Sequence, residues 1–338
     1  MGHLKRVIKL GILALLSLAW GLDLGGQVTR PSAGGKREAL PSSGVSTFKV
    51  AVNVLFEEVR VLDERGNPID NLKAEDFRIS EDGAEQKITY FYHEEFPLAI
   101  ALVVDNSSSV SAELDELRRG ALDTLAQLKP EDEVAIFSFS EKPEMVEGLT
   151  RNRETVAEDL WALSPYGGTD INAAVYEAAL YLGGAPRDRR RAIILVSDNE
   201  PADDHARNVR EVTRAALQSS TAVYSIKVGN LKHSRGFMLK HSEAPFHDVE
   251  KICRESGGEL IDTRSGVSVT GAMKTILTWL KEGYTIGYTP TNLRQDGSYR
   301  SIDVRWNERS DAHRQKFTIS ARKGYYAPVA HEDANHAP

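Results

Sequence analysis

The pattern of apolar and polar positions changes twice along the chain and divides it into three parts. Between residues 48 and 92, short runs that alternate apolar and polar residues are separated by turn residues such as Asp82-Gly83. This pattern predicts β-strands at 48–54, 59–62, 76–80 and 86–92, with a hairpin around the Asp-Gly turn. Alternation returns after Gly283, where strands are expected at 284–288, 299–306 and 316–320, and the pattern ends at Gly324-Tyr325-Tyr326.

The middle part, residues 97–283, alternates apolar runs with segments of helical period. Leu98–Val104 contains no polar residue, which is typical of a parallel strand covered on both faces. Further strands are expected at 134–139, 144–149, 192–196, 222–228 and 259–261, and helices at 111–129, 152–163, 170–182, 206–218, 246–255 and 267–280. This order predicts an α/β fold: a doubly wound, mostly parallel sheet wrapped by helices.

The β-patterned segments 48–96 and 284–328 flank this unit, and each is small for a domain of its own. Because the two ends of a doubly wound domain lie near each other, the segments are expected to pair. The interpretation is one β-sandwich-like module built from an N-terminal and a C-terminal segment.

The N-terminus resembles an export signal. Lys5, Arg6 and Lys9 precede the apolar run 10–22, which is too short for a membrane span of about 20 residues. We expect a signal peptide at 1–26, a Pro/Gly/Ser-rich flexible linker at 27–47 and a disordered tail at 329–338. The protein is therefore expected to be exported, to the periplasm or out of the cell, and to have no stable membrane span after cleavage. The alternative is that the signal stays uncleaved and anchors the protein.

Charge and cysteine content narrow the class of protein. The formal net charge is −7, whereas a general nucleic-acid binder carries a basic excess, so no nucleic-acid partner is expected. The single cysteine, Cys253, excludes an intramolecular disulfide framework and lies at helical spacing with Val249 and Ile252, as a buried residue would.

Oxygen-bearing side chains follow the strands of the middle part. Asp105-Asn106-Ser107-Ser108-Ser109 comes directly after the run 98–104, Thr169 stands in Gly167-Gly168-Thr169-Asp170 before a helix, and Asp198 follows the strand 192–196. In an open parallel sheet, ligands bind outside the carboxyl ends of the strands. These loops therefore predict a site for one hard divalent cation, Mg²⁺ first, with Mn²⁺ or Ca²⁺ as alternatives.

The charges of the five candidate ligands suggest which of them bind the cation directly and which bind it through water. The hydroxyls of Ser107, Ser109 and Thr169 are neutral and are expected to bind the cation directly. Asp105 and Asp198 are expected to hold coordinated waters, because two directly bound carboxylates would neutralise the ion. A cation held in this way stays attractive to an acidic side chain of a partner.

The DxSxS motif, the following Thr and the last Asp resemble the metal-ion-dependent adhesion site of von Willebrand factor type A domains. The resemblance covers residues 97–283 and implies a six-stranded, mostly parallel sheet whose cation binds an Asp or Glu carboxylate of a protein ligand. The flanks, over roughly 48–328, resemble exported bacterial proteins related to that family. Two positions depart from the pattern: Val110 replaces the Met that many members have after the motif, and Asn199 replaces the Gly after the last Asp.

The sequence thus predicts a non-enzymatic, cation-dependent module for protein–protein binding or adhesion. One alternative is a scaffold that binds through its β-module and whose metal site is vestigial. The other is a metal-assisted hydrolase, which needs a general base and a pocket that the sequence does not reveal.

Overall fold

The computed structural model describes residues 54–93, 96–110, 114–199, 207–229, 246–310 and 316–329. They belong to the unit Ala51–Pro338, which the contacts within the chain separate from Met1–Val50. The expected signal peptide, linker and residues 330–338 of the tail lie outside the described residues. Val329 is described and forms a β-bridge with Asp296. Among the described helices, none is both long and apolar enough to span a membrane.

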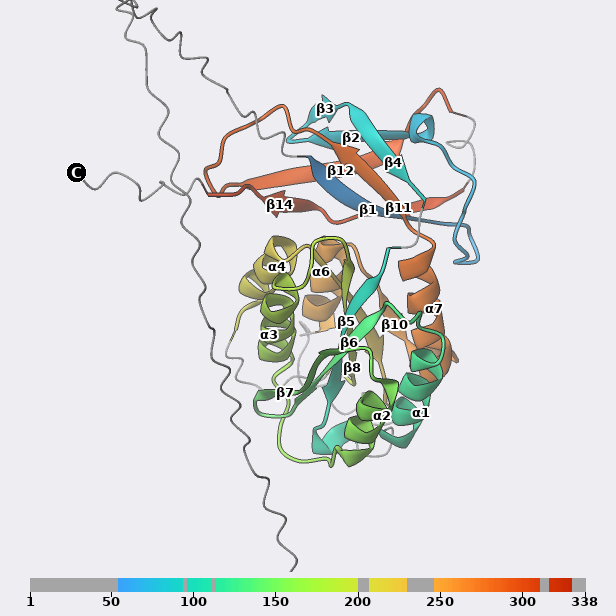
Figure 1. The fold of residues 1–338 in the computed structure, drawn as a ribbon, viewed down its shortest axis with the longest axis vertical. Helices are drawn as coiled ribbons and strands as arrows, with labels where there is room; N and C mark the ends of the chain where they lie inside the picture. Colours follow the sequence, from blue (N-terminus) through green and yellow to red (C-terminus); the bar gives the residue numbers. More distant parts are fainter. Residues whose placement is uncertain are drawn as a thin grey trace, which may run out of the picture. The chain divides into compact units, whose positions relative to one another are not determined.

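A six-stranded sheet lies at the centre of the middle part, in the order β10-β9-β8-β5-β6-β7 (Figure 1). All neighbours are parallel except β6 and β7, which are antiparallel. The strands are β5 (Leu98–Asp105), β6 (Glu133–Phe139), β7 (Pro143–Thr150), β8 (Arg190–Ser197), β9 (Thr221–Lys227) and β10 (Leu260–Asp262). Every residue of β5 is buried, as the apolar run predicts. The expected α/β class and doubly wound sheet are confirmed.

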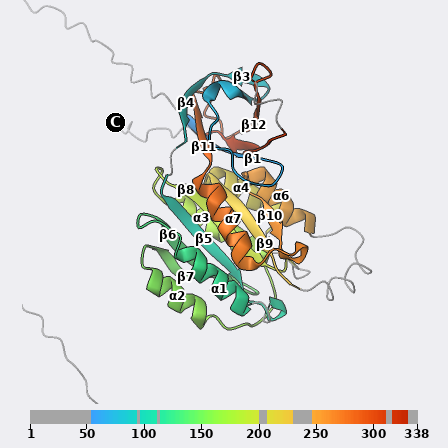
Figure 2. The same cartoon turned by 90° about the vertical axis from the view of Figure 1, so that its right-hand side faces the viewer.

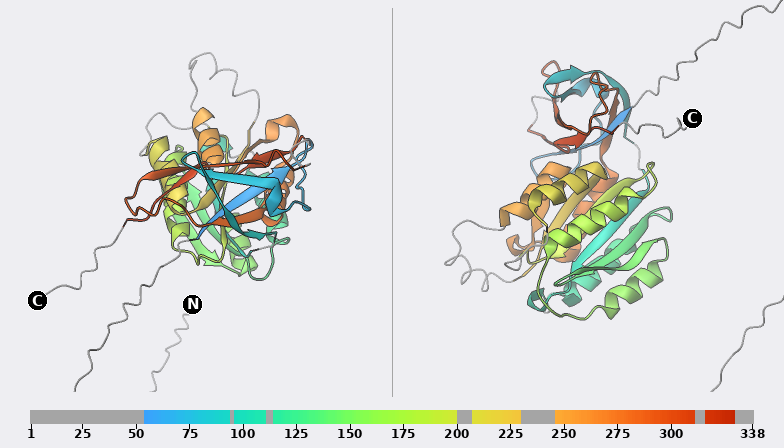
Figure 3. Two further views of the ribbon diagram at one scale, coloured as in Figure 1. Left: turned by 90° about the horizontal axis from the view of Figure 1, so that it is seen from above. Right: turned by 90° about the vertical axis from the view of Figure 1, so that its left-hand side faces the viewer.

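Helices cover both faces of this sheet, and each face has its own hydrophobic core. On one face lie α1 (Leu114–Leu125), α2 (Arg153–Ala162) and α7 (Val269–Lys281), seen in front of the sheet in Figure 2. On the other lie α3 (Ile171–Gly183), α4 (Val209–Gln218) and α6 (Phe246–Ser256); the right-hand view of Figure 3 shows α3 and α4 on this side. Cys253 on α6 is buried in the second core, as expected.

Side-chain caps fix where several helices begin. Asn152 accepts hydrogen bonds from the first-turn amides of α2, and Ser268 from Gly271 N of α7. The helix expected at 206–218 begins later, at Val209, because Asn208 and Glu211 form a reciprocal capping box at its start.

Two four-stranded antiparallel sheets form the β-module, and each combines strands from both flanks of the α/β unit (Figures 1 and 3). One sheet has the order β13-β1-β11-β4 and the other β14-β12-β2-β3. The strands are β1 (Leu55–Leu62), β2 (Phe77–Glu81), β3 (Ala84–Gln86), β4 (Ile88–Tyr92), β11 (Tyr284–Tyr288), β12 (Tyr299–Trp306), β13 (Thr318–Ser320) and β14 (Gly324–Tyr326). A third core, with Phe77, Ile79, Tyr284 and Ile286, draws on both sheets. The expected pairing of the two flanks is confirmed.

The hairpin around Asp82-Gly83 differs from the expectation. The strand predicted at 86–92 is divided, so that β3 pairs with β2 while β4 crosses to the other sheet and pairs with β11. The division follows Gln86, whose buried amide exchanges hydrogen bonds with Thr291 in both directions, at 3.0 Å each. Alternation alone does not show which sheet a strand joins, since both halves keep the same period.

Candidate metal centre

Asp105 and Asp198 lie at the point where the order of the central sheet reverses. The chain leaves β5 for β6 on one side and later returns as β8 on the other side of β5. Val104 of β5 is paired with Val196 of β8, so the two strands end at the same edge. Asp105 is the last residue of β5, and Asp198 directly follows β8. Ligand sites in open α/β sheets form at this kind of switch point.

The carboxylate of Asp105 is held rigidly. The side chain is fully buried; Ser107 N donates to its Oδ1 at 2.9 Å, and Ser197 Oγ donates to its Oδ2 at 2.5 Å. Burial raises the pKa of Asp105 to about 6, and the negative charge of Asp198 acts in the same direction, whereas the hydrogen bonds from Ser107 and Ser197 oppose the rise. Two neighbouring carboxylates at a buried edge repel each other, and a cation bound between them would reduce this repulsion.

The rest of the DxSxS motif turns away from the strand at once. Ser107 is buried, and Ser109 lies in the short 3-10 helix η2 (Ser108–Val110); the side chain of Ser109 is outside what the structure describes. Val110, which stands where many relatives have Met, is buried in the core under α1. This departure therefore concerns packing.

Thr169 reaches the same edge on the loop between α2 and α3. Tyr166 N donates to the carbonyl of Asn106 and Asp170 N to that of Ser140, both at 2.8 Å, which places the loop against the ends of β5 and β6. Thr169 is buried there. The Asp170 carboxylate accepts from Ala173 N and caps α3, so it stabilises the helix start.

Asn199, after Asp198, adopts a left-handed backbone conformation with φ 56°. Asn populates this region more readily than most residues with a side chain, although less freely than the Gly expected from the family pattern. Its backbone N–H donates to Ser197 Oγ at 3.0 Å, and its Nδ2 donates to Ser225 Oγ of β9 at 3.1 Å. The substitution keeps the turn and ties it to the next strand.

Four of the five candidate ligands thus have buried side chains in loops at one edge of the sheet: Asp105, Ser107, Thr169 and Asp198. For Ser109 the structure describes the backbone at this edge and no more. Sequence reasoning gave no role to Ser197, which orients Asp105. Its only signal was a hydroxyl residue at a strand end just before Asp198.

The donor chemistry fits a hard divalent cation. The candidates are hydroxyl and carboxylate oxygens, which suit Mg²⁺, Mn²⁺ or Ca²⁺. Within the described ranges there is no group of three or more His, Cys, Asp or Glu side chains that could hold a metal.

Comparison with known proteins agrees with this fold. Residues 100–200 match the family model of the von Willebrand factor type A domain. Solved structures similar to this chain include an aerotolerance-related membrane protein from Bacteroides fragilis NCTC 9343, at 20% identity over 54% of this chain and 98% of that chain, with a TM-score of 0.44. Another is the conserved hypothetical protein BatB from Bacteroides thetaiotaomicron, at 16% identity over 54% and 99%, with a TM-score of 0.41.

A third similar structure is proximal thread matrix protein 1 from the mussel byssus, whose MIDAS motif is occupied by zinc. The identity is 13% over 59% of this chain and 49% of that chain, with a TM-score of 0.44. The assignment of this chain rests on the family match at 100–200 and on the strand order of the central sheet. Over residues 100–200, the α/β unit of this chain is similar to the von Willebrand factor type A domain.

Proposed function

We propose that this protein binds a protein partner through one divalent cation held by Asp105, Ser107, Ser109, Thr169 and Asp198. The observation that carries the proposal is the meeting of hydroxyl and carboxylate residues at the switch point, with the Asp105 carboxylate fixed between Ser107 N and Ser197 Oγ. Mg²⁺ is the first choice of cation because the ligands are all oxygens.

The hydroxyls of Ser107, Ser109 and Thr169 would contact the cation, and Asp105 and Asp198 would hold its waters. Both oxygens of Asp105 accept hydrogen bonds from the protein, and a carboxylate has about four acceptor sites, so it can also accept from water. The bound cation would supply an attractive position for an anionic oxygen.

The partner group that fits this position is an Asp or Glu carboxylate. A carboxylate completes the coordination of a hard cation that keeps open positions, and neutral hydroxyl ligands leave most of the ionic charge to attract it. The proposed role is therefore adhesion or protein–protein recognition without turnover. Export to the periplasm or beyond is part of the proposal and is supported by the basic and apolar residues at 1–26.

Calorimetric titration of the chain with Mg²⁺ and with Mn²⁺ tests the cation site. Wild-type protein should show one site, and Asp105→Ala should lose it while keeping its circular dichroism spectrum. Asp262→Asn is the matched control: Asp262 also ends a parallel strand at this edge, but it is paired with Arg264, so cation affinity should not change. Equal affinity in wild type and Asp105→Ala contradicts the ligand set.

The carboxylate step is tested separately. Peptides that contain Asp or Glu are compared with their Asn or Gln counterparts, in Mg²⁺ and in EDTA. The proposal predicts binding only of acidic peptides and only in Mg²⁺. Binding that persists in EDTA favours the alternative of a scaffold with a vestigial metal site, and conversion of a peptide to products favours a hydrolase.

A further inference from the structure

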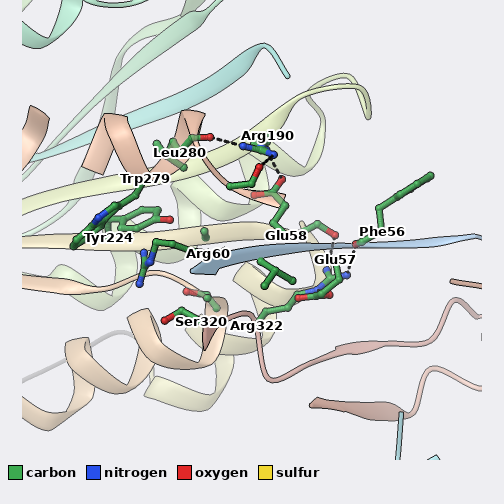
Figure 4. Close-up of a pocket in the computed structure, with 16 residues that line it drawn as sticks. Phe56, Glu57, Glu58, Arg60, Arg190, Tyr224, Trp279, Leu280, Ser320 and Arg322 are labelled. Carbon is green, nitrogen blue, oxygen red and sulfur yellow. Dashed lines mark hydrogen bonds and ion pairs between the residues drawn. The ribbon is translucent and has the colours of Figure 1, made fainter. Parts of the chain in front are cut away.

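A small cavity lies where β1 of the β-module meets the α/β unit, away from the candidate metal centre. Its volume is about 70 Å³, and it is lined by Arg60, Arg190, Arg322, Glu58, Tyr224 and Trp279, among others (Figure 4). Arg60 lies on β1, Arg190 begins β8, and Arg322 lies between β13 and β14. Three elements distant in sequence thus contribute an arginine to the lining of this cavity.

Two of the three arginines donate hydrogen bonds through both of their terminal nitrogens. Arg322 donates to Glu57 Oε2, to Ser220 Oγ and to the carbonyl of Phe56. Arg190 donates through Nη1 and Nη2 to carbonyls at the end of α7 and just after it. Each nitrogen of Arg322 therefore already donates one hydrogen bond, and Arg190 keeps only its Nε without a hydrogen-bond acceptor.

Arg60 is different, because most of its donors have no acceptor. Its guanidinium carbon lies 4.5 Å from the Trp279 ring centre, and its Nη2 donates to Glu259 Oε2 at 2.7 Å. Its Nε and Nη1 are buried without a hydrogen-bond partner among the described residues, and so is the Nε of Arg190. The residues are 5% and 3% exposed, respectively, so bulk water does not serve these donors.

Unpaired buried donors of this kind are costly, and charged donors bind anionic oxygens more strongly than neutral ones. The cavity has room for about five waters, or for one small oxyanion. Each of the three arginines has one carboxylate neighbour: Glu259 for Arg60, Glu58 for Arg190 and Glu57 for Arg322. Glu58 and Glu259 have side chains 45% and 48% exposed, and burial raises the pKa of Glu57 to about 7.

We propose that this cavity binds one small oxyanion, such as phosphate or a carboxylate, at Arg60 Nε and Nη1. Glu58 limits the affinity, because its carboxylate lines the same cavity and repels an anion. The Trp279 ring, 4.5 Å from the guanidinium carbon, restricts the movement of the Arg60 side chain.

The test is calorimetric titration of the full chain, in EDTA and at constant ionic strength, with sodium phosphate, sulfate and acetate. Wild-type protein should bind phosphate at one site. Arg60→Met keeps an apolar side chain on Trp279 and removes the donors, and it should weaken phosphate at least tenfold. Glu58→Gln should tighten phosphate several-fold. Arg305→Gln is the control, because Arg305 is exposed and lines no part of the cavity.

The two substitutions must move the affinity in opposite directions, which a general loss of stability cannot do. If Arg60→Met does not fold, Glu58→Gln alone decides. No binding of any of the three anions to wild type, or equal affinity in wild type and Glu58→Gln, overturns the proposal and leaves the cavity to water. Asp105→Ala should bind phosphate as wild type does, so failure of the metal proposal is distinguishable from failure of this one.

Discussion

Ser197 Oγ donates a hydrogen bond of 2.5 Å to Asp105 Oδ2, and this contact joins the ends of β8 and β5. The same Ser197 oxygen accepts the backbone N–H of Asn199. One hydroxyl therefore orients the carboxylate at the end of one strand and the turn that follows Asp198 at the end of the next. Two candidate ligands distant in sequence are positioned by a residue that is not itself a candidate ligand.

Replacement of Ser197 by Ala should weaken cation binding by about tenfold, the equivalent of one charge-assisted hydrogen bond. The carboxylate loses one of the hydrogen bonds that fix it, so its orientation toward a coordinated water becomes less defined. Titration with Mn²⁺ measures the loss, and Ser197→Thr, which retains the hydroxyl, should recover part of the affinity. Unchanged affinity in Ser197→Ala would show that the contact serves only the fold.

Asn199 gives a prediction about stability. Asn199→Ala should destabilise the fold by about 1–2 kcal/mol, because Ala tolerates a positive φ less well than Asn and lacks the hydrogen bond to Ser225. Asn199→Gly restores freedom of the backbone but not the side-chain contact, so its loss should be smaller. Urea unfolding of the two variants checks the order, and a more stable Ala variant would exclude backbone strain at this turn.

Arg190 connects the β8 start to the end of α7. Its Nη1 donates to the carbonyl of Leu280 at 2.6 Å and its Nη2 to that of Gly283 at 2.8 Å. Arg190→Met should lower the free energy of unfolding by about 3 kcal/mol, since these buried carbonyls lose their donor. Urea unfolding is the measurement; Arg305→Met, at an exposed site, should change stability by less than about 0.5 kcal/mol.

Glu57 should make stability depend on pH. Its side chain is fully buried, and burial raises its pKa to about 7 despite the hydrogen bond of 2.7 Å from Arg322 Nε. A folded-state pKa above the unfolded value means that the contribution to stability is complete below about pH 4.5 and is lost as pH rises through 7. The neighbouring charge of Glu58 acts in the same direction.

The measurement is the free energy of unfolding of wild type and Glu57→Gln from pH 5 to pH 8. Wild type should lose about 2–3 kcal/mol more than the variant over this range, since each unit of pKa shift corresponds to about 1.4 kcal/mol and part of the change lies below pH 5. Comparison of the two proteins removes the contributions of other groups, including Asp105. Parallel curves would contradict a raised pKa at Glu57.

Much of the fold follows from local pattern. The apolar run of β5 and the change from a period of two to a helical period predict the α/β fold class. Alternation of apolar and polar residues on both flanks of the α/β unit predicts the strands of the β-module. The assignment of β4 to the other sheet could not be predicted, because it depends on Gln86 and Thr291, which are far apart in sequence. The start of α4 could not be predicted either, because several polar residues near Asn208 could equally have capped the helix.

In the candidate metal centre, too, some features could be predicted from the sequence and others could not. Asp105 and Asp198 are visible in sequence because each follows an apolar strand. The role of Ser197 emerges only when β8 lies beside β5, and the arginine cavity only when β1 meets the α/β unit. Arg60 is surrounded by ordinary strand residues and Arg190 lies in the basic run 187–191, which is typical of an exposed loop, so nothing in their local sequence marks them as buried donors.

The central claim is the position of the cation. Crystals soaked in Mn²⁺ provide the most direct test, through the anomalous difference map. The account predicts one peak at the carboxyl ends of β5 and β8, within direct coordination distance of the Ser107, Ser109 and Thr169 hydroxyls, and separated from Asp105 and Asp198 by water. Density at another place only, or no peak at saturating Mn²⁺ in crystals of the wild-type chain, would contradict it.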